Sequence, residues 1–244
     1  MIFDILLMKN KIKKLEAHAS HLLDGIIALK GKYAIFEPLI FNQDVITLYG
    51  NKERNRGFEI IKNTLFFSCA QDIAKFCMDS DAQKRTPSIK SLTNELTDTQ
   101  LIAYLRENYA TRAMPSVENE TDPLVLEELR NFANTENIKR GGEFDHHLNE
   151  LIFISNELFN SKLIVSFKTI RDKVSAHTES RLSKDEYQLV DISKLGIKWI
   201  DIKTIIDEMQ RATALINFII RRADFAWDNL DKQFTTASTD FWRI

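Results

Sequence analysis

Residues that interrupt helices are scarce in this chain, and that scarcity constrains its fold more than any other feature. The 244 residues include only 7 glycines and 4 prolines, and the stretch from Glu143 to Leu195 contains neither. A β-rich fold would need frequent turns, which these two residue types usually supply. Because 44% of the residues are hydrophobic, the chain can also bury a large core. We therefore predict an all-α fold, built as a helical bundle.

Apolar residues recur at steps of three, four or seven in three segments, as they do on one face of an amphipathic helix. The three series are Phe58, Ile61, Leu65, Cys69, Ile73, Phe76; then Phe144, Leu148, Ile152, Phe159, Leu163, Phe167, Ile170, Val174; then Ile202, Ile206, Met209, Thr213, Ile216, Ile220, Ala223, Trp227. The second series predicts one long helix that ends near His177, before a polar interval. The third predicts a helix that continues to Trp227. We interpret this third series as intramolecular core, because it spans too few heptads for a separate coiled coil.

Weaker signals mark the other boundaries. They are a break near Pro38, a connector over residues 50–57, loops at Asp79-Ser80-Asp81 and Thr86-Pro87-Ser88, a helix over Leu92–Tyr109, a helix from Asp122-Pro123 to about Phe132, and an end at Gly141-Gly142. We predict one domain over residues 1–244. Within it, residues 1–57 form an N-terminal helical elaboration and residues 58–244 form the bundle.

The N-terminal apolar run does not read as a secretory signal, because Asp4 interrupts it and its basic cluster comes after the run. No apolar stretch approaches the roughly 20 residues that a membrane-spanning helix needs. Cys69 and Cys77 lie on one predicted helix about 12 Å apart along its axis, which is too far for a disulfide. We expect core thiols, a cytoplasmic protein and no membrane partner.

Histidine pairs and familiar motifs give no metal or cofactor site. Adjacent residues such as His146 and His147 face different ways on a helix, whereas His18 and His21 share a face but have no third ligand nearby. The sequence also lacks a glycine-rich phosphate loop, a Gly-x-Ser-x-Gly elbow and a Cys-x-x-Cys pair. We therefore expect neither a metal nor a cofactor.

The formal net charge of −2 excludes the strongly basic surface of many nucleic-acid-binding proteins, but one basic stretch remains at residues 162–184. Within it, Arg171 can hold a phosphate through two parallel hydrogen bonds, and His177 can transfer a proton near neutral pH. This pair suits metal-free RNA cleavage, in which a base deprotonates the 2′-hydroxyl and a cation stabilises the charge on the attacked phosphate. On this chemistry alone, the alternative remains that His177 only closes the apolar stripe and Arg171 is a solvated flank.

The segment resembles the motif of the HEPN superfamily, in which an Arg and a following polar residue precede an Ala-His pair. Here the motif stands as Arg171, Asp172 and Ala176-His177. The chain also resembles the AbiU-type abortive-infection branch through this motif, the aromatic helix around Leu65-Phe66-Phe67, the stretch Asp79 to Leu92 with Thr86-Pro87-Ser88-Ile89, and the closing Thr239-Asp240-Phe241-Trp242. This resemblance covers most of the chain.

The resemblance implies a HEPN-like helical bundle with additional N-terminal helices, acting as a metal-independent endoribonuclease. It further implies a homodimer with its cleft between paired motifs, a defensive or toxic role in response to phage, and possible control by an antitoxin protein. HEPN toxins that pair with a nucleotidyltransferase antitoxin carry a Tyr two residues after the motif His, where this chain has Glu179. The type of any antitoxin therefore stays open.

We expect RNA as the substrate, with His177 as general base or acid, Arg171 on the scissile phosphate, and Asp172 orienting Arg171 or the imidazole. The further candidates for RNA contact are Lys173, Ser175, Lys168 and Arg181. Two alternatives come from other classes: a non-catalytic HEPN-like module that binds RNA or a partner protein, and a structural helical adaptor. The presence of both Arg171 and His177 favours the enzyme.

Overall fold

The protein is almost entirely helical. The computed structural model describes residues 2–51, 53–80, 85–111, 121–175, 180–183, 186–189 and 191–243. Its α-helices are α1 (Ile2–Phe36), α2 (Pro38–Phe41), α3 (Gln43–Tyr49), α4 (Asn55–Met78), α5 (Ile89–Glu95), α6 (Thr99–Thr111), α7 (Pro123–Asn160), α8 (Lys162–Ile170), α9 (Trp199–Arg221) and α10 (Trp227–Trp242). Between α8 and α9 lie the π-helical turn η1 (Arg171–Ser175), the antiparallel strands β1 (Ser180–Ser183) and β2 (Glu186–Leu189), and the 3-10 turn η2 (Ile192–Leu195). The predicted all-α fold is confirmed, with this small hairpin as the exception among the described residues.

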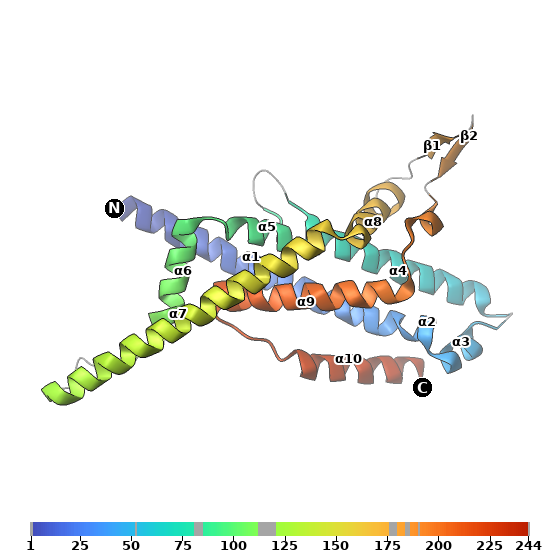
Figure 1. Ribbon diagram of the computed structural model, residues 1–244. Coiled ribbons are helices and arrows are strands. Elements are labelled where there is room, and N and C mark those ends of the chain that lie inside the picture. The colour runs from blue at the N-terminus through green and yellow to red at the C-terminus, as the bar shows by residue number, and fades with distance from the viewer. Residues whose placement is uncertain are drawn as a thin grey trace.

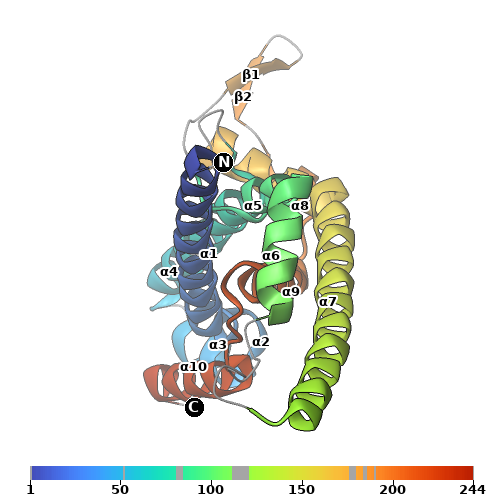
Figure 2. The same cartoon turned by 90° about the vertical axis from the view of Figure 1, so that its left-hand side faces the viewer.

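The long helices α1, α4, α7 and α9 pack together into the bundle (Figure 1). α1 contacts α9 and α4, α7 contacts α9 and α6, and α8 contacts α4. The β1–β2 hairpin projects away from the helices in both views (Figure 1, Figure 2). α10 contacts α1, where the Trp242 indole N–H donates to the Ile35 carbonyl at 3.0 Å.

The N-terminal region belongs to the same core as the rest of the bundle. α1 ends at Phe36 and α2 begins at Pro38, where the sequence predicts a break. Leu22, Ile26 and Leu29 of α1 are completely buried, in one cluster with residues of α4, α7 and α9. The division of the chain at residue 57 stays a prediction.

The apolar series on α9 is confirmed as the side of that helix that faces the core. Its buried members are Ile202, Ile206, Met209, Thr213, Ile216 and Ile220. Each large apolar side chain removed from water contributes roughly 1.5–3 kcal/mol to folding. The series does not continue to Trp227 as predicted, because the chain leaves α9 at Arg222, whose φ of 54° is left-handed. Gly or Asn usually occupies such a position, so the sequence carries no signal for this helix end.

The long helix predicted from Phe144 to His177 is divided at Ser161. This residue ends α7 and begins α8, where its Oγ accepts a hydrogen bond from the Leu163 N–H at 3.3 Å. Serine is a preferred N-cap residue, so Ser161 is a signal for this break, which the continuous apolar series obscures. The prediction of one continuous helix is therefore wrong.

The buried face of α7 also differs from the predicted one. It follows Phe144, Leu148, Leu151, Ile154, Ser155 and Leu158. Ile152 lies one residue off this face, so its side chain turns by about 100°. As a result Ile152 is 38% exposed instead of belonging to the core.

α7 runs straight through Gly141-Gly142, where the sequence predicts an end, and thus extends far beyond Phe132. A Cβ atom at Gly141 would lie 2.7 Å from Nη2 of Arg106, whose guanidinium reaches across from α6. Gly141 therefore leaves room on α7 for the Arg106 guanidinium. Arg106 also binds Asp145 one turn further along α7, with its Nε 2.9 Å from Oδ1.

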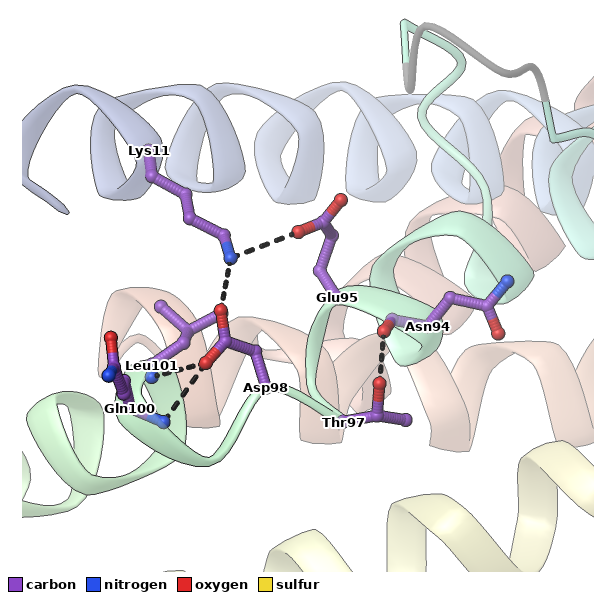
Figure 3. A network of polar contacts seen from close by, with 7 residues as sticks. All are labelled: Lys11, Asn94, Glu95, Thr97, Asp98, Gln100 and Leu101. Atoms are coloured by element: carbon purple, nitrogen blue, oxygen red, sulfur yellow. Dashed lines mark hydrogen bonds and ion pairs between the residues drawn. The ribbon is translucent and has the colours of Figure 1, made fainter. Parts of the chain in front are cut away.

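The helix predicted over Leu92–Tyr109 is divided as well, because α5 ends at Glu95 before α6 begins. Asp98 caps α6 by accepting a hydrogen bond from the Leu101 N–H at 3.2 Å. Lys11 of α1 binds the same carboxylate at 2.6 Å and reaches Glu95 at 3.4 Å (Figure 3). The hydrogen bond from Lys11 lowers the pKa of Asp98. One lysine thus joins α1 to the junction of two other helices.

The described ranges contain no helix with both the length and the apolarity that crossing a membrane requires. Cys69 and Cys77 lie on α4, where both are completely buried, as predicted for core thiols. Burial raises the pKa of each thiol to about 12.

We expect both thiols to resist a thiol-specific reagent in the native protein at about pH 8, because the reactive thiolate is almost absent and the sulfur atoms are inaccessible. In guanidinium chloride, both cysteines of each chain should react at the rate of a free thiol. The spectroscopic reagent DTNB measures both conditions. Rapid modification of either cysteine under native conditions would contradict the burial of its side chain.

Candidate functional site

α8 carries the Arg171 segment to the surface of the bundle. Ile164, Phe167 and Ile170 recur at steps of three and are completely buried, and α8 packs against α4. These apolar contacts fix both the orientation and the end of this short helix. Arg171 follows directly on the last of them, with its side chain 22% exposed.

The helix changes type at Arg171. Residues Arg171–Ser175 form η1, which contacts α4 as well as α8. At the junction, the Arg171 N–H is shared between the carbonyls of Phe167 and Lys168. π-Helical turns are rare and occur frequently at functional sites. The expectation of a regular helix up to His177 is therefore wrong from Arg171 to Ser175, and His177 itself lies outside the described residues.

Arg171 lies between two carboxylates. Its Nε donates to Oδ1 of Asp172 at 2.7 Å, and its Nη1 donates to Oδ1 of Asp79. Asp172 is the next residue of the same turn, whereas Asp79 comes 92 residues earlier, directly after α4. The side chains of Asp79 and Asp172 are 32% and 41% exposed, so water reaches the cluster.

Asp79 is itself held at the junction of α4 and α5. Its N–H donates to the Lys75 carbonyl at 3.3 Å, which closes the last turn of α4. Its carbonyl accepts a hydrogen bond from the Ser88 hydroxyl. Ser88 is completely buried and caps α5 by accepting the Ser91 N–H at 3.1 Å. The contact with Arg171 therefore joins η1 to α4 and α5 at one point.

The cluster has a formal charge of −1, because one guanidinium faces two carboxylates. Burial acts to lower the pKa of Arg171, but the hydrogen bonds and charges of Asp172 and Asp79 outweigh it and raise the pKa. Arg171 is therefore a cation at any physiological pH. Within the described part of the chain, no hydrogen bond involves its Nη2, so this edge can receive a phosphate oxygen.

The other predicted site residues lie along the same segment. They are Lys168 in the last turn of α8, Lys173 and Ser175 in η1, and Arg181 in β1. Lys168 is exposed and precedes Arg171 by three residues, which places the two on neighbouring positions of the helix surface. Of the predicted site residues, Arg171 and Asp172 are in direct contact.

Asp79 has no place in the predicted site, because its sequence setting, Asp79-Ser80-Asp81, indicates only a loop. Periodicity relates residues on one helix and cannot connect residues so far apart in the chain. The one sequence signal is that Asp79 begins the stretch, through Leu92, that resembles the AbiU-type branch.

No three His, Cys, Asp or Glu side chains among the described residues lie close enough to hold a metal ion. A cavity of about 440 Å³ lies elsewhere, between α1 and α5. Lys11 and Glu95 in its lining already form an ion pair at 3.4 Å. This cavity shares no residue with the Arg171 cluster, which remains the best candidate site.

Comparison with known protein families gives a match that covers most of the chain. A family model of the HEPN type, described as AbiU2, matches residues 12–241. The matched range includes Asp79 and the complete stretch from Arg171 to His177. No curated protein and no solved structure matches the chain.

We expect Arg171→Ala to lower the free energy of unfolding by only about 1–2 kcal/mol, because both lost ion pairs are partly exposed to solvent. Phe167→Ala, one turn earlier and completely buried, should lose about 3–5 kcal/mol. Urea unfolding followed by circular dichroism compares the two variants. An equal loss in both would show that Arg171 serves mainly to hold the fold together.

Proposed function

The chain belongs to the AbiU2 branch of the HEPN superfamily, and from that premise we propose that it is a metal-independent endoribonuclease. The observation that carries the proposal is the restrained guanidinium of Arg171 at the start of the HEPN motif, whose Nη2 has no hydrogen-bond partner among the described residues. A cation fixed before substrate arrives stabilises developing charge without the cost of reorganisation.

The proposed reaction is an internal transesterification. A general base, His177, removes the proton of the ribose 2′-hydroxyl, and the oxygen attacks the adjacent phosphorus. The bond from phosphorus to the 5′-oxygen breaks, and a general acid protonates that oxygen as it leaves. Arg171 stabilises the negative charge that builds up on the phosphate oxygens. The products are a 2′,3′-cyclic phosphate and a free 5′-hydroxyl.

The surrounding cations have a separate role in this proposal. Lys168, Lys173 and Arg181 contact phosphates on either side of the scissile bond, and the Ser175 hydroxyl bonds to the RNA backbone. Contacts of this kind position the strand without reading its sequence. The exposure of Lys168 next to Arg171 supports this arrangement.

A homodimer completes the proposed site. Each chain supplies one motif histidine, whereas the reaction needs both a base and an acid. In a symmetric dimer the same surface meets itself, so two Arg171 and two His177 side chains surround one cleft. We further propose that the enzyme acts in the cytoplasm against phage infection and that an antitoxin protein of unknown type can restrain it.

A non-catalytic HEPN-like module that binds RNA or a partner protein is the second candidate. The observation that favours it is the pair of carboxylates on Arg171, which offsets the positive charge that a scissile phosphate requires. The two functions differ in whether the covalent structure of RNA changes. A cleavage assay therefore separates them.

We expect purified protein to cleave total RNA in the presence of a chelator and to leave 2′,3′-cyclic phosphate ends. His177→Ala should reduce the rate by about 100-fold or more, since general acid–base catalysis contributes about 10²–10⁴-fold. His146→Ala is the matched control, because this exposed histidine lies on α7, outside the motif. Wild-type cleavage by a folded His177→Ala protein would remove His177 from the mechanism.

We also expect some cleavage, above that of either variant alone but below wild type, to return when Arg171→Ala and His177→Ala chains are co-expressed. A mixed dimer keeps one intact Arg171 and one intact His177 around the shared cleft, whereas each parental dimer lacks one of the two residue types. Two different affinity tags isolate the mixed dimer for the assay. A monomeric wild-type protein, or a mixed dimer no more active than its parents, would contradict the shared site.

A further inference from the structure

We infer that Asp79, at the end of α4, is a positioning residue that orients the Arg171 guanidinium toward the scissile phosphate. This inference rests on the proposed function. It assigns a role in the site to α4 and to the α4–α5 junction, which lie outside the Arg171-to-His177 motif.

Two carboxylates fix the plane of the Arg171 guanidinium by bonding to different nitrogens. Asp172 belongs to the same turn as Arg171, so any displacement of η1 moves both residues together. Asp79 belongs to another part of the bundle. Among the described residues, it is the hydrogen-bond partner that ties the Arg171 side chain to a separate element. Asp79 therefore sets where the guanidinium lies relative to the core.

Asp79 can serve as a reference point because its own backbone is restrained on both sides. Its N–H is bonded to the last turn of α4, and its carbonyl is bonded to the buried Ser88. The last two turns of α4 are anchored by Ile73 and Cys77, both completely buried. The carboxylate thus projects from a fixed backbone toward Arg171.

The negative charge of Asp79 distinguishes a positioning role from a role in binding RNA. A carboxylate repels the phosphate that Arg171 is proposed to hold, so Asp79 weakens RNA binding through its charge. Asp79 therefore favours the reaction by orienting the Arg171 guanidinium, which raises the rate of the chemical step. With Nε bonded to Asp172 and Nη1 bonded to Asp79, Nη2 has no hydrogen-bond partner among the described residues. Asp79 should therefore have opposite effects on kcat and on RNA affinity.

The first test measures kcat and KM on a short RNA that the wild-type protein cleaves. Asp79→Ala removes both charge and acceptor, and we expect kcat to fall about 10- to 100-fold, as for a misplaced catalytic group, while KM stays unchanged or falls. Asp79→Asn keeps an acceptor oxygen and loses only the charge. It should retain kcat within about three-fold of wild type, with a lower KM.

Asp145→Ala is the matched control. It breaks another ion pair between helices, in which Arg106 Nε lies 2.9 Å from Asp145 Oδ1, and neither residue belongs to the Arg171 cluster. Its kcat and KM should equal those of the wild type. Asp79→Ala with wild-type or increased kcat would overturn the inference, as would Asp79→Asn losing as much as Asp79→Ala, because charge alone would then explain the effect.

The second test measures the mobility of the Arg171 side chain and does not depend on RNA cleavage. ¹⁵N relaxation of the Arg171 Nε–H group, identified by its loss in Arg171→Lys, should report a rigid side chain in wild type and Asp145→Ala and a mobile one in Asp79→Ala. Equal rigidity in all three proteins would refute positioning by Asp79. If the wild-type protein cleaves no RNA, the proposed enzyme fails, yet this measurement still decides whether Asp79 orients Arg171.

Discussion

Apolar packing between α1 and α9 organises the bundle, because the other long helices are arranged around this pair. Both helices contribute completely buried side chains, such as Ile26 and Ile216. Asn217 lies within the same seam, where its Nδ2 donates to the Thr213 carbonyl at 2.9 Å and to the Ala19 carbonyl of α1 at 3.4 Å. A buried amide left without partners would cost about 1–3 kcal/mol, so this contact favours one alignment of the two helices.

Successive apolar contacts connect the α1–α9 pair to the Arg171 cluster. α4 packs on α1, and α8 packs on α4, so the ends of α4 and α8 come to lie beside each other. The ion pair between Asp79 and Arg171 forms where these ends meet. Partly exposed ion pairs contribute little to stability, typically about 0–1 kcal/mol. Packing therefore places the charges, and the charges then determine the orientation of one side chain.

The parts of the fold that follow local periodicity could be predicted from the sequence, and those that depend on distant partners could not. The buried face of α9 was predicted as far as Ile220 because it repeats at steps of three and four. Gly141 lies inside α7, where the Arg106 side chain of another helix occupies the space that a Cβ atom would need. Arg222 ends α9 in a conformation that its residue type rarely adopts.

The same distinction applies to the site. Arg171 and Asp172 are adjacent in the sequence and in contact in the structure. Asp79 is 92 residues from Arg171, and no spacing rule relates them. In the proposed enzyme this difference has a functional meaning, because the motif supplies the reacting groups while the packed helices supply their geometry. Neither the net charge of −2 over the chain nor the formal −1 of the Arg171 cluster attracts phosphate, so RNA binding by the proposed enzyme depends on neighbouring cations such as Lys168. The two carboxylates then favour cleavage through the orientation of Arg171 and not through the strength of RNA binding.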